Sequence, residues 1–427
     1  MKKEMNFEEA VMPGLSNIKV PNMARISQNV PDYSLDDVQS RMIDKLEKSS
    51  VSTKINKGDQ IAIGVGSRGL DKIQVVVKTL INFIQKHGGC PFIVPSMGSH
   101  GGATVKGQKE VLNDYGINEE ELGVPIKASM EVKKIGTTNN GIDVYFDKIS
   151  SQADIIIPIN RVKVHTNFEA EHESGIMKML AIGFGNHKGC SYIHGHGFEN
   201  FSIIIPNVAK TMMSSLPIDI SIALLEDGHD NLSQIEVLEK NEVEDKEKEM
   251  LKKQKELMPE IPFEKVDILI VEKMGKNISG TGLDTNIISR IKSVDVEIDK
   301  IVVLDLTKET HGNATGMGMA DIVPKEFLKK INFKATITNS LAAREVSFAK
   351  MPVVLKDEMT AIKTAIWLFN KPIEEIKIVH IPNTLNIVNM NISQGLYKEA
   401  KENNDIKMSK EFRMEFSNGV LKNKFNY

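Results

Sequence analysis

The feature that most constrains the fold is a pattern of strand, glycine-rich turn and helix, which occurs twice in succession from residue 60. The first copy reads QIAIGVG, SRG and DKIQVVVKTLINFIQKHG, and the second reads GCPFIVPS, MGSHGGAT and VKGQKEVLNDYG. Short apolar runs that end at glycine predict buried strands, and the apolar spacing that follows predicts amphipathic helices. This alternation is typical of an α/β fold on a parallel sheet, with its functional site at the carboxyl ends of the strands.

The length of the chain predicts two such domains. A chain of 427 residues exceeds the usual size of a single hydrophobic core. A new series of strands and helices begins at VDILIVEK, shortly after Pro262. We therefore expect an N-terminal domain of residues 1–262 and a C-terminal domain of residues 263–427, both α/β with parallel-type sheets.

Two segments are expected to contribute little to either core. Residues 1–55 are polar and contain Pro13, Pro21 and Pro31, which indicates an arm lying over a domain. Residues 233–260 predict a long, highly charged helix. Charged helical faces usually face water, so this helix is expected to be a solvated connector.

The composition excludes several classes of partner. Lys and Arg number 54 against 57 Asp and Glu, and this near balance supplies no field to hold nucleic acid or an anionic membrane. Cys90 and Cys190 are too few for a disulfide framework, and the first residues lack the apolar run of a signal peptide. We expect a soluble, cytoplasmic protein without a nucleic-acid or membrane partner.

Each of the two glycine-rich turns offers a functional interpretation and a structural one. The turn at residues 64–69, GVGSRG, can hold a phosphate on its amides and an oxyanion on Arg68, but it fits a tight structural turn equally well. The next strand offers no acidic residue that could bind a ribose, and the turn is not followed by the lysine of a P-loop. In the second turn His100 stands between glycines, where a neutral imidazole can act as a general base. A capping or solvent-facing histidine is the alternative.

Histidines gather in one part of the chain. Five of the ten histidines lie between residues 165 and 196, close to several lysines: His165, His172, His187, His194 and His196. Such clustering suggests a transition metal, but the spacing H-x-x-x-H and a cysteine pair are both absent, so a zinc-hydrolase site is only weakly indicated. Lys178 lies in the apolar run SGIMKMLAIGFG, where burial disfavours the ammonium and makes a lysine nucleophilic. A lysine that extends its charged end to solvent is the alternative.

A further candidate stretch, GTGLDTNIISRIKS, occupies residues 280–293 in the second predicted domain. We expect a glycine loop that enters a helix here, with Asp284, Ser289, Arg290 and Lys292 near the helix start. Its cationic side chains suit a carboxylate ligand. An ordinary exposed helix start is the alternative.

Taken in order, these motifs resemble the nickel-pincer-nucleotide-dependent lactate racemase family. The resemblance runs over about residues 60–300. It consists of the glycine turn with Arg68, the G-S-H of His100, N-R-V-K-V-H ending at His165, S-G-I-M-K ending at Lys178, then His194 and L-D-T-N-I-I-S-R-I-K. The ordered set carries the resemblance, since no single piece is specific.

The resemblance implies two α/β domains with the active site in the cleft between them. It also implies a nickel-pincer nucleotide cofactor, nickel pyridinium-3,5-bisthiocarboxylate mononucleotide, supplied by cofactor-biosynthesis enzymes. Lys178 would form the covalent tether to this cofactor, and His194 would be the protein ligand of the nickel. Gly66, Ser67 and Arg68 would contact the cofactor from the first glycine turn.

The same resemblance implies a racemase or epimerase of a small 2-hydroxy acid. His100 and His165 would be the paired acid/base catalysts, with His172 as an alternative to His165. One histidine would take the hydroxyl proton while hydride leaves C2 for the cofactor, and the hydride would then return to the other face. Arg68, Ser289 and Lys292 would contact the substrate.

Two positions depart from the pattern of the family. Val65 stands where lactate racemase has an aspartate, and Ser289 stands where it has a glutamine. We expect both in the substrate pocket, and therefore a substrate larger or more polar than lactate. The valine also motivates an alternative function, a non-catalytic scaffold of the same fold that binds a nucleotide or a metal.

Overall fold

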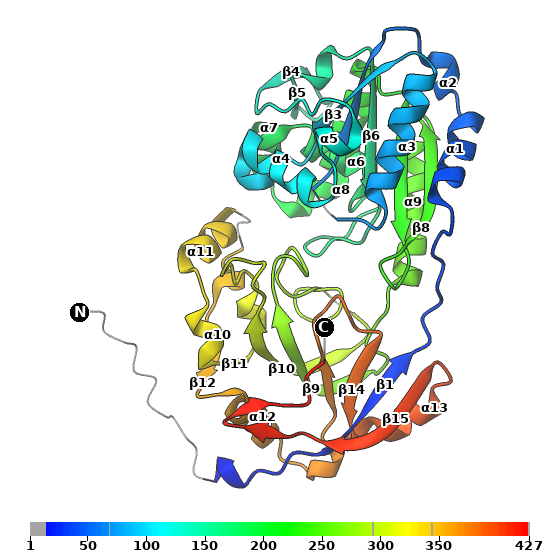
Figure 1. Ribbon diagram of the computed structural model, residues 1–427. Helices are drawn as coiled ribbons and strands as arrows, with labels where there is room; N and C mark the ends of the chain where they lie inside the picture. Colours follow the sequence, from blue (N-terminus) through cyan, green and yellow to red (C-terminus); the bar gives the residue numbers. More distant parts are fainter. Residues whose placement is uncertain (1–13, 68, 293, 343–344, 426–427) are drawn as a thin grey trace. The chain divides into compact units, whose positions relative to one another are not determined.

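The computed structural model describes residues 14–67, 69–292, 294–342 and 345–425, and these form two compact units. Pro31–Met258 make up what we call the central unit, and Met1–Val30 together with Pro259–Tyr427 make up the terminal unit. Both contain a sheet with helices packed against it, which confirms the predicted α/β class (Figure 1). No helix of the described ranges is long and apolar enough to cross a membrane.

The central unit is built on a five-stranded sheet in the order β3-β2-β6-β7-β8. The first four strands are parallel, and β8 is antiparallel to β7, so the sheet is mixed where a parallel one was expected. The strands are β2 (Gln60–Val65), β3 (Cys90–Pro95), β6 (Ile155–Arg161), β7 (Ile220–Glu226) and β8 (Leu232–Glu239). The carboxyl ends of the two glycine-turn strands, β2 and β3, therefore lie side by side.

Helices cover both faces of this sheet. Ile61, Ile63 and Val65 of β2 share a core cluster with α1 (Val38–Lys48) and α3 (Ile73–Lys86), whereas Ala62 belongs to the cluster on the opposite face. The elements that complete the unit are α2 (Val51–Lys54), α4 (Val105–Asp114), α5 (Glu119–Leu122), the hairpin β4 (Val132–Thr137) and β5 (Asp143–Asp147), α6 (Gly175–Lys178), α7 (Asn186–His194), α8 (Phe201–Ser215) and α9 (Val243–Leu257). Short helical turns are η2 (Gly101–Ala103), η3 (Ser150–Gln152), the π-helical turn η4 (Met179–Gly183) and η5 (Phe198–Asn200).

The charged helix α9 is shorter than predicted and is not a solvated connector. Residues 233–239 belong to strand β8, and the helix begins only at Val243. Its face toward the unit buries apolar side chains in the same core as α6 and α8. Glu247 and Gln254 are also buried on that face. The high charge of the segment hides the spacing of its buried side chains, because most of its polar side chains lie on the other faces of the helix.

Gly64 of β2 lets the segment after α6 pack flat on the sheet. A Cβ at this position would lie 2.9 Å from Phe184 Cε2, and closer still to Cζ of the same ring. The Phe184 ring is fully buried and stacks on Phe146, with 4.8 Å between the ring centroids. A side chain at residue 64 would thus displace the helical segment that carries Lys178.

The terminal unit is built on an eight-stranded sheet in the order β12-β11-β10-β9-β13-β14-β1-β15. The strands from β12 to β13 are parallel, and β14, β1 and β15 are antiparallel to their neighbours. The bounds are β1 (Asn22–Gln28), β9 (Lys265–Met274), β10 (Glu297–Leu306), β11 (Ile322–Pro324), β12 (Val353–Leu355), β13 (Ile378–Ile381), β14 (Asn389–Ser393) and β15 (Ile406–Arg413), with a separate hairpin of β16 (Phe416–Ser417) and β17 (Val420–Leu421).

The helices of the terminal unit are α10 (Lys325–Lys329), α11 (Phe333–Ala342), α12 (Glu358–Trp367) and α13 (Tyr397–Glu402). Its 3-10 turns are η1 (Leu15–Asn17), η6 (Met317–Met319), η7 (Val346–Ala349), η8 (Ile373–Glu375) and η9 (Gln394–Leu396). The first 55 residues are more than an arm, because β1 pairs with β14 and β15 inside this sheet. Met23, Ala24 and Ile26 of β1 are fully buried.

Candidate active site

Two predicted residues meet at the carboxyl ends of β2 and β3. Ser67 follows β2 after Gly66, and its hydroxyl oxygen is hydrogen-bonded to Nδ1 of His100 in the loop after β3. The loop itself is fixed by the Gly98 amide, which donates to the Gly183 carbonyl at 3.0 Å. Arg68, the third predicted residue of the first turn, lies outside the described residues.

Lys178 stands at the junction of two kinds of helix. It is the last residue of α6, and the chain continues at once into the π-helical turn η4, whose residues are all buried. Single π-helical turns are frequent at functional sites because they re-aim the side chains next to them. The half-buried Lys178 has its Nζ 5.2 Å from the centre of the Phe168 ring.

His194 ends helix α7 with one ring nitrogen fixed. Its Nδ1 lies 2.7 Å from the Cys190 carbonyl oxygen one turn earlier, so Nδ1–H donates and Nε2 carries the lone pair. Burial disfavours the imidazolium, but the contacts with the Cys190 thiol and carbonyl outweigh burial and raise the pKa of His194. Burial alone would raise the pKa of Cys190, and the hydrogen bond with His194 reverses this effect and lowers it.

Three phenylalanines form a surface that contacts His165, Lys178 and His194. Phe168, Phe198 and Phe201 form a contiguous aromatic cluster, with centroids 5.0 to 6.2 Å apart. The His165 ring packs on Phe168 at 4.4 Å, and the His194 ring packs edge-on against Phe201 at 5.2 Å. Since Lys178 also lies over Phe168, residues from three separate motifs share one apolar surface.

The loop of His100 approaches this cluster through its neighbour Ser99. The Ser99 hydroxyl oxygen lies 3.7 Å from Cys190 Sγ, which in turn lies 3.6 Å from His194 Nδ1. A Cβ on Gly98 would lie 3.2 Å from the same sulfur. Ser67 and His100 of the two glycine turns are therefore linked, through the loop of Ser99, to the region of the central unit that contains His194.

His165 and His172 occupy different surroundings. His165 is half-buried, and its Nδ1 accepts the Asn167 amide at 3.1 Å, which leaves the proton of the neutral ring on Nε2. His172 is 3% exposed, and its Nδ1 lies 3.7 Å from Glu247 Oε2 on α9. Of these two histidines, His165 is the one whose ring packs against the aromatic cluster.

The histidine cluster does not build a zinc site in the described part of the chain. No three His, Cys, Asp or Glu side chains there converge as metal ligands. His187 is exposed, and the His196 ring packs edge-on against Tyr192 at 5.0 Å. The zinc-hydrolase interpretation therefore finds no ligand set among these residues.

The predicted helix after GTGLD is absent from the terminal unit. Residues 275–292 form turns and bends, with Ser289 at a φ of 48°. Lys292 Nζ donates to Asn286 Oδ1 at 2.9 Å. Arg290 anchors the start of β10, since its guanidinium donates to the Ile298 carbonyl at 2.7 Å. The prediction failed because asparagine and aspartate favour local side-chain hydrogen bonds over a helix.

Val65 does not face a pocket. It is the last residue of β2, is 3% exposed and belongs to the core cluster beneath α3. Successive side chains of a strand point to opposite faces of the sheet, so Val65 lies on the same face as Ile63, and Gly64 lies on the other face. The expectation that residue 65 lines a substrate pocket is therefore wrong, because Val65 is part of the hydrophobic core.

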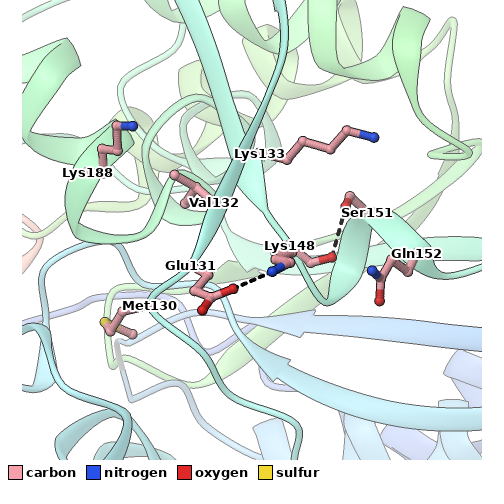
Figure 2. Close-up of a pocket in the computed structure, with 8 residues that line it drawn as sticks. All are labelled: Met130, Glu131, Val132, Lys133, Lys148, Ser151, Gln152 and Lys188. Carbon is pink, nitrogen blue, oxygen red and sulfur yellow. Dashed lines mark hydrogen bonds and ion pairs between the residues drawn. The ribbon is translucent and has the colours of Figure 1, made fainter.

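A cavity of about 480 Å³ lies elsewhere in the central unit, between β4, η3 and the start of α7 (Figure 2). Lys133, Lys148 and Lys188 line it, and Lys148 is ion-paired with Glu131 at 2.6 Å. None of the predicted site residues lines this cavity. It is an open, basic depression that is separate from the aromatic cluster.

Sequence reasoning missed the residues that assemble the site. The three phenylalanines lie at irregular spacings on different elements, and no local pattern marks them as a cluster. Cys190 precedes His194 by four residues, a helical spacing that places both side chains on one face, and this signal was available in the sequence.

Comparisons with known proteins give a fold but no sequence family. No protein-family model matches the chain, and no curated protein matches it. The lactate racemase apoprotein from Thermoanaerobacterium thermosaccharolyticum is 12% identical, with 85% of this chain and 98% of that chain covered at a TM-score of 0.51. A protein from Thermotoga maritima is also 12% identical, with 73% and 83% covered at a TM-score of 0.50.

Proposed function

We propose that this protein is a racemase or epimerase of a 2-hydroxy acid that uses a nickel-pincer nucleotide attached to Lys178. The single observation that carries the proposal is the convergence of Lys178, His194 and His165 on one aromatic cluster. The shared fold with a lactate racemase apoprotein gives independent support. The substrate and the cofactor are both part of the proposal.

The donor set of the central unit fits this cofactor. A pincer nucleotide brings most of its own metal ligands, so the protein needs a single imidazole and an amine for attachment. The His194 ring offers Nε2 because Nδ1 is held by the Cys190 carbonyl, the second-shell arrangement that commonly fixes a metal-binding histidine. Lys178 offers the amine at the edge of the same aromatic surface.

When bound, the cofactor would supply the acceptor and donor of hydride. The residues of the chain would move the proton and exclude water. His100, oriented through Nδ1 by Ser67, would take the hydroxyl proton of one enantiomer. His165, in its protonated form, would return a proton from Nε2, the nitrogen that does not face the Asn167 amide, to the same oxygen after inversion at C2. The phenylalanine cluster would keep water from the reacting carbon.

Metal content and absorption test the attachment. The full chain is co-expressed with active cofactor-biosynthesis enzymes as wild type, Lys178→Ala and Lys188→Ala. Lys188 is a matched control because it lies in the same stretch but packs on Tyr145, with its Nζ 4.6 Å from that ring. We expect nickel, a visible chromophore and a mass adduct on the Lys178 peptide in wild type and Lys188→Ala only. Wild-type protein without any of them contradicts the proposal.

Chiral chromatography of 2-hydroxy acids then decides whether the loaded protein is an enzyme or a non-catalytic scaffold. Loaded enzyme is expected to interconvert the enantiomers of at least one acid, and His165→Ala is expected to lower turnover by about 10²-fold or more. The His172→Ala variant is expected to keep its turnover and lose stability instead, since His172 is buried against Glu247. Loaded protein that inverts no acid would favour the non-catalytic scaffold.

A further inference from the structure

The segment that carries both His165 and Lys178 has little structure of its own. Residues 162–174, between β6 and α6, form neither helix nor strand. Precise placement of reacting groups requires side chains and backbone locked by neighbours. The position of Lys178 must therefore be set by an element outside this segment.

Helix α9 contacts the turn of α6 that directly precedes Lys178. The buried carboxylate of Glu247 accepts the backbone amides of Ile176 and Met177, the second at 3.1 Å. These are amides of the first turn of α6, which have no partner within the helix. Gly175 leaves room for the carboxylate, because a Cβ there would lie 2.6 Å from Glu247 Cδ.

A second contact from α9 reaches the other end of the segment. Lys255 Nζ lies 3.1 Å from Oε1 of Glu173, which is fully buried. The other oxygen of Glu173 accepts the backbone amide of His165 at 2.7 Å. One helix thus fixes the backbone of both His165 and the turn before Lys178.

Burying two carboxylates is unfavourable unless they are fully hydrogen-bonded, and apolar residues would pack α9 against the core equally well. Val243, Met250 and Leu251 already do so. Both acidic side chains instead bond to the backbone of residues at or next to the proposed site. Stability alone does not account for this choice of residue types.

We propose that Glu247 is a positioning residue for Lys178: its carboxylate caps α6 and holds the lysine where the cofactor is attached. The proposal rests on the proposed role of Lys178. Its effect acts through the backbone of residues 175–177, and Glu247 touches neither substrate nor cofactor. The link from Lys255 through Glu173 gives His165 the same kind of support.

The first test uses the full chain expressed without the biosynthesis enzymes, so that it requires no cofactor. Trace acetylation with acetic anhydride is read at each lysine by peptide mass spectrometry, and Lys178 is compared with Lys188 as an internal reference. The variants are Glu247→Gln, which keeps one acceptor oxygen, and Glu247→Met, which keeps none. Glu244→Gln is the matched control, because Glu244 lies on the same helix but pairs with Lys210 at the surface.

We expect the ratio of Lys178 to Lys188 acetylation to rise about fivefold in Glu247→Met, by less in Glu247→Gln, and not at all in Glu244→Gln. Faster hydrogen exchange of the peptide containing Ile176 and Met177 is expected in the same order. An unchanged ratio in folded Glu247→Gln overturns the proposal, even where its melting temperature falls. If Glu247→Met does not fold, Glu247→Gln decides.

The second test repeats the comparison with co-expressed biosynthesis enzymes. We expect the fraction of Lys178 that carries the cofactor to fall in Glu247→Gln and to stay at the wild-type level in Glu244→Gln. Equal attachment in wild type and both Glu247 variants refutes positioning and leaves the proposed function intact. The acetylation ratio could instead change in the Glu247 variants while wild-type Lys178 carries no cofactor. That outcome refutes the proposed function and leaves the positioning of Lys178 by Glu247 intact.

Discussion

Replacing Gly175 with alanine tests the packing between α6 and α9 most directly. Gly175 has a φ of 72°, and its position faces the Glu247 carboxylate. Gly123 has the same φ of 72°, but nothing lies within 4 Å of a Cβ there. The two alanine variants therefore share the backbone strain, but only the Gly175→Ala variant has a steric conflict with Glu247.

The size of each effect follows from these surroundings. Left-handed backbone costs an alanine roughly 1 kcal/mol at either position. At residue 175 the Cβ also displaces Glu247, which removes a helix cap worth about 1 kcal/mol and leaves buried amides unpaired for about 1 kcal/mol more. We expect Gly123→Ala to lose about 1 kcal/mol and Gly175→Ala about 3 kcal/mol of unfolding free energy.

The assay must report on the central unit alone, because a chain of two units need not unfold in one step. Hydrogen exchange of peptides from β2 and β6 in increasing urea gives the unfolding free energy of this unit. Equal losses in Gly175→Ala and Gly123→Ala would refute the reasoning. In the Glu247→Ala background the conflict is absent, so Gly175→Ala should then lose only about 1 kcal/mol.

Two further predictions concern the edge of the site. Burial raises the pKa of Glu226, and its ion pair with Arg161 only partly offsets this. Arg161→Met should therefore destabilise the central unit by about 3 kcal/mol at pH 7. Relative to wild type, the loss begins as pH rises past the raised folded pKa of wild-type Glu226 and grows toward the still higher folded pKa in the variant, because the unfolded carboxyl, with a pKa of about 4.3, is already ionised there. Unfolding at pH 5 and 7 checks this sign. In protein loaded with the proposed cofactor, Cys190→Ala should retain nickel, because Nδ1 of His194 is held by a backbone carbonyl, whereas His194→Ala should lose the nickel on metal analysis.

The sequence predicts the α/β class and the β2 and β3 repeat well, because buried parallel strands are continuous apolar runs between glycines. Its failures have physical causes. Strand β1 is recruited into the terminal sheet by pairing with β14 and β15, partners more than 350 residues away. Such pairing depends on tertiary contacts that local propensity does not contain. The irregular loop around Ser289 is held by side-chain bonds that a helical pattern cannot anticipate.

For the candidate site, the sequence marks residues that could carry chemistry, but it does not indicate how they are held. His100, His165, Lys178 and His194 are conspicuous because ionisable residues interrupt apolar or glycine-rich runs. Their assembly depends on aromatic side chains that look like ordinary core. The resemblance assigns Ser67 to the cofactor, and the structure adds a hydrogen bond between its hydroxyl and His100 that the sequence does not indicate.

Helix α9 shows why the supporting residues stay hidden. A glutamate in a run such as VEDKEKEMLKK carries no sign that it differs from its neighbours, because charge and spacing describe it equally well as a surface residue. What distinguishes Glu247 is a buried partner 70 residues away, at Met177. The Glu247 carboxylate is shielded from solvent and accepts two backbone amides. These bonds fix both the carboxylate and the backbone of α6. The proposed role of Lys178 therefore depends, through the α6 backbone, on one glutamate of a helix that is distant in sequence.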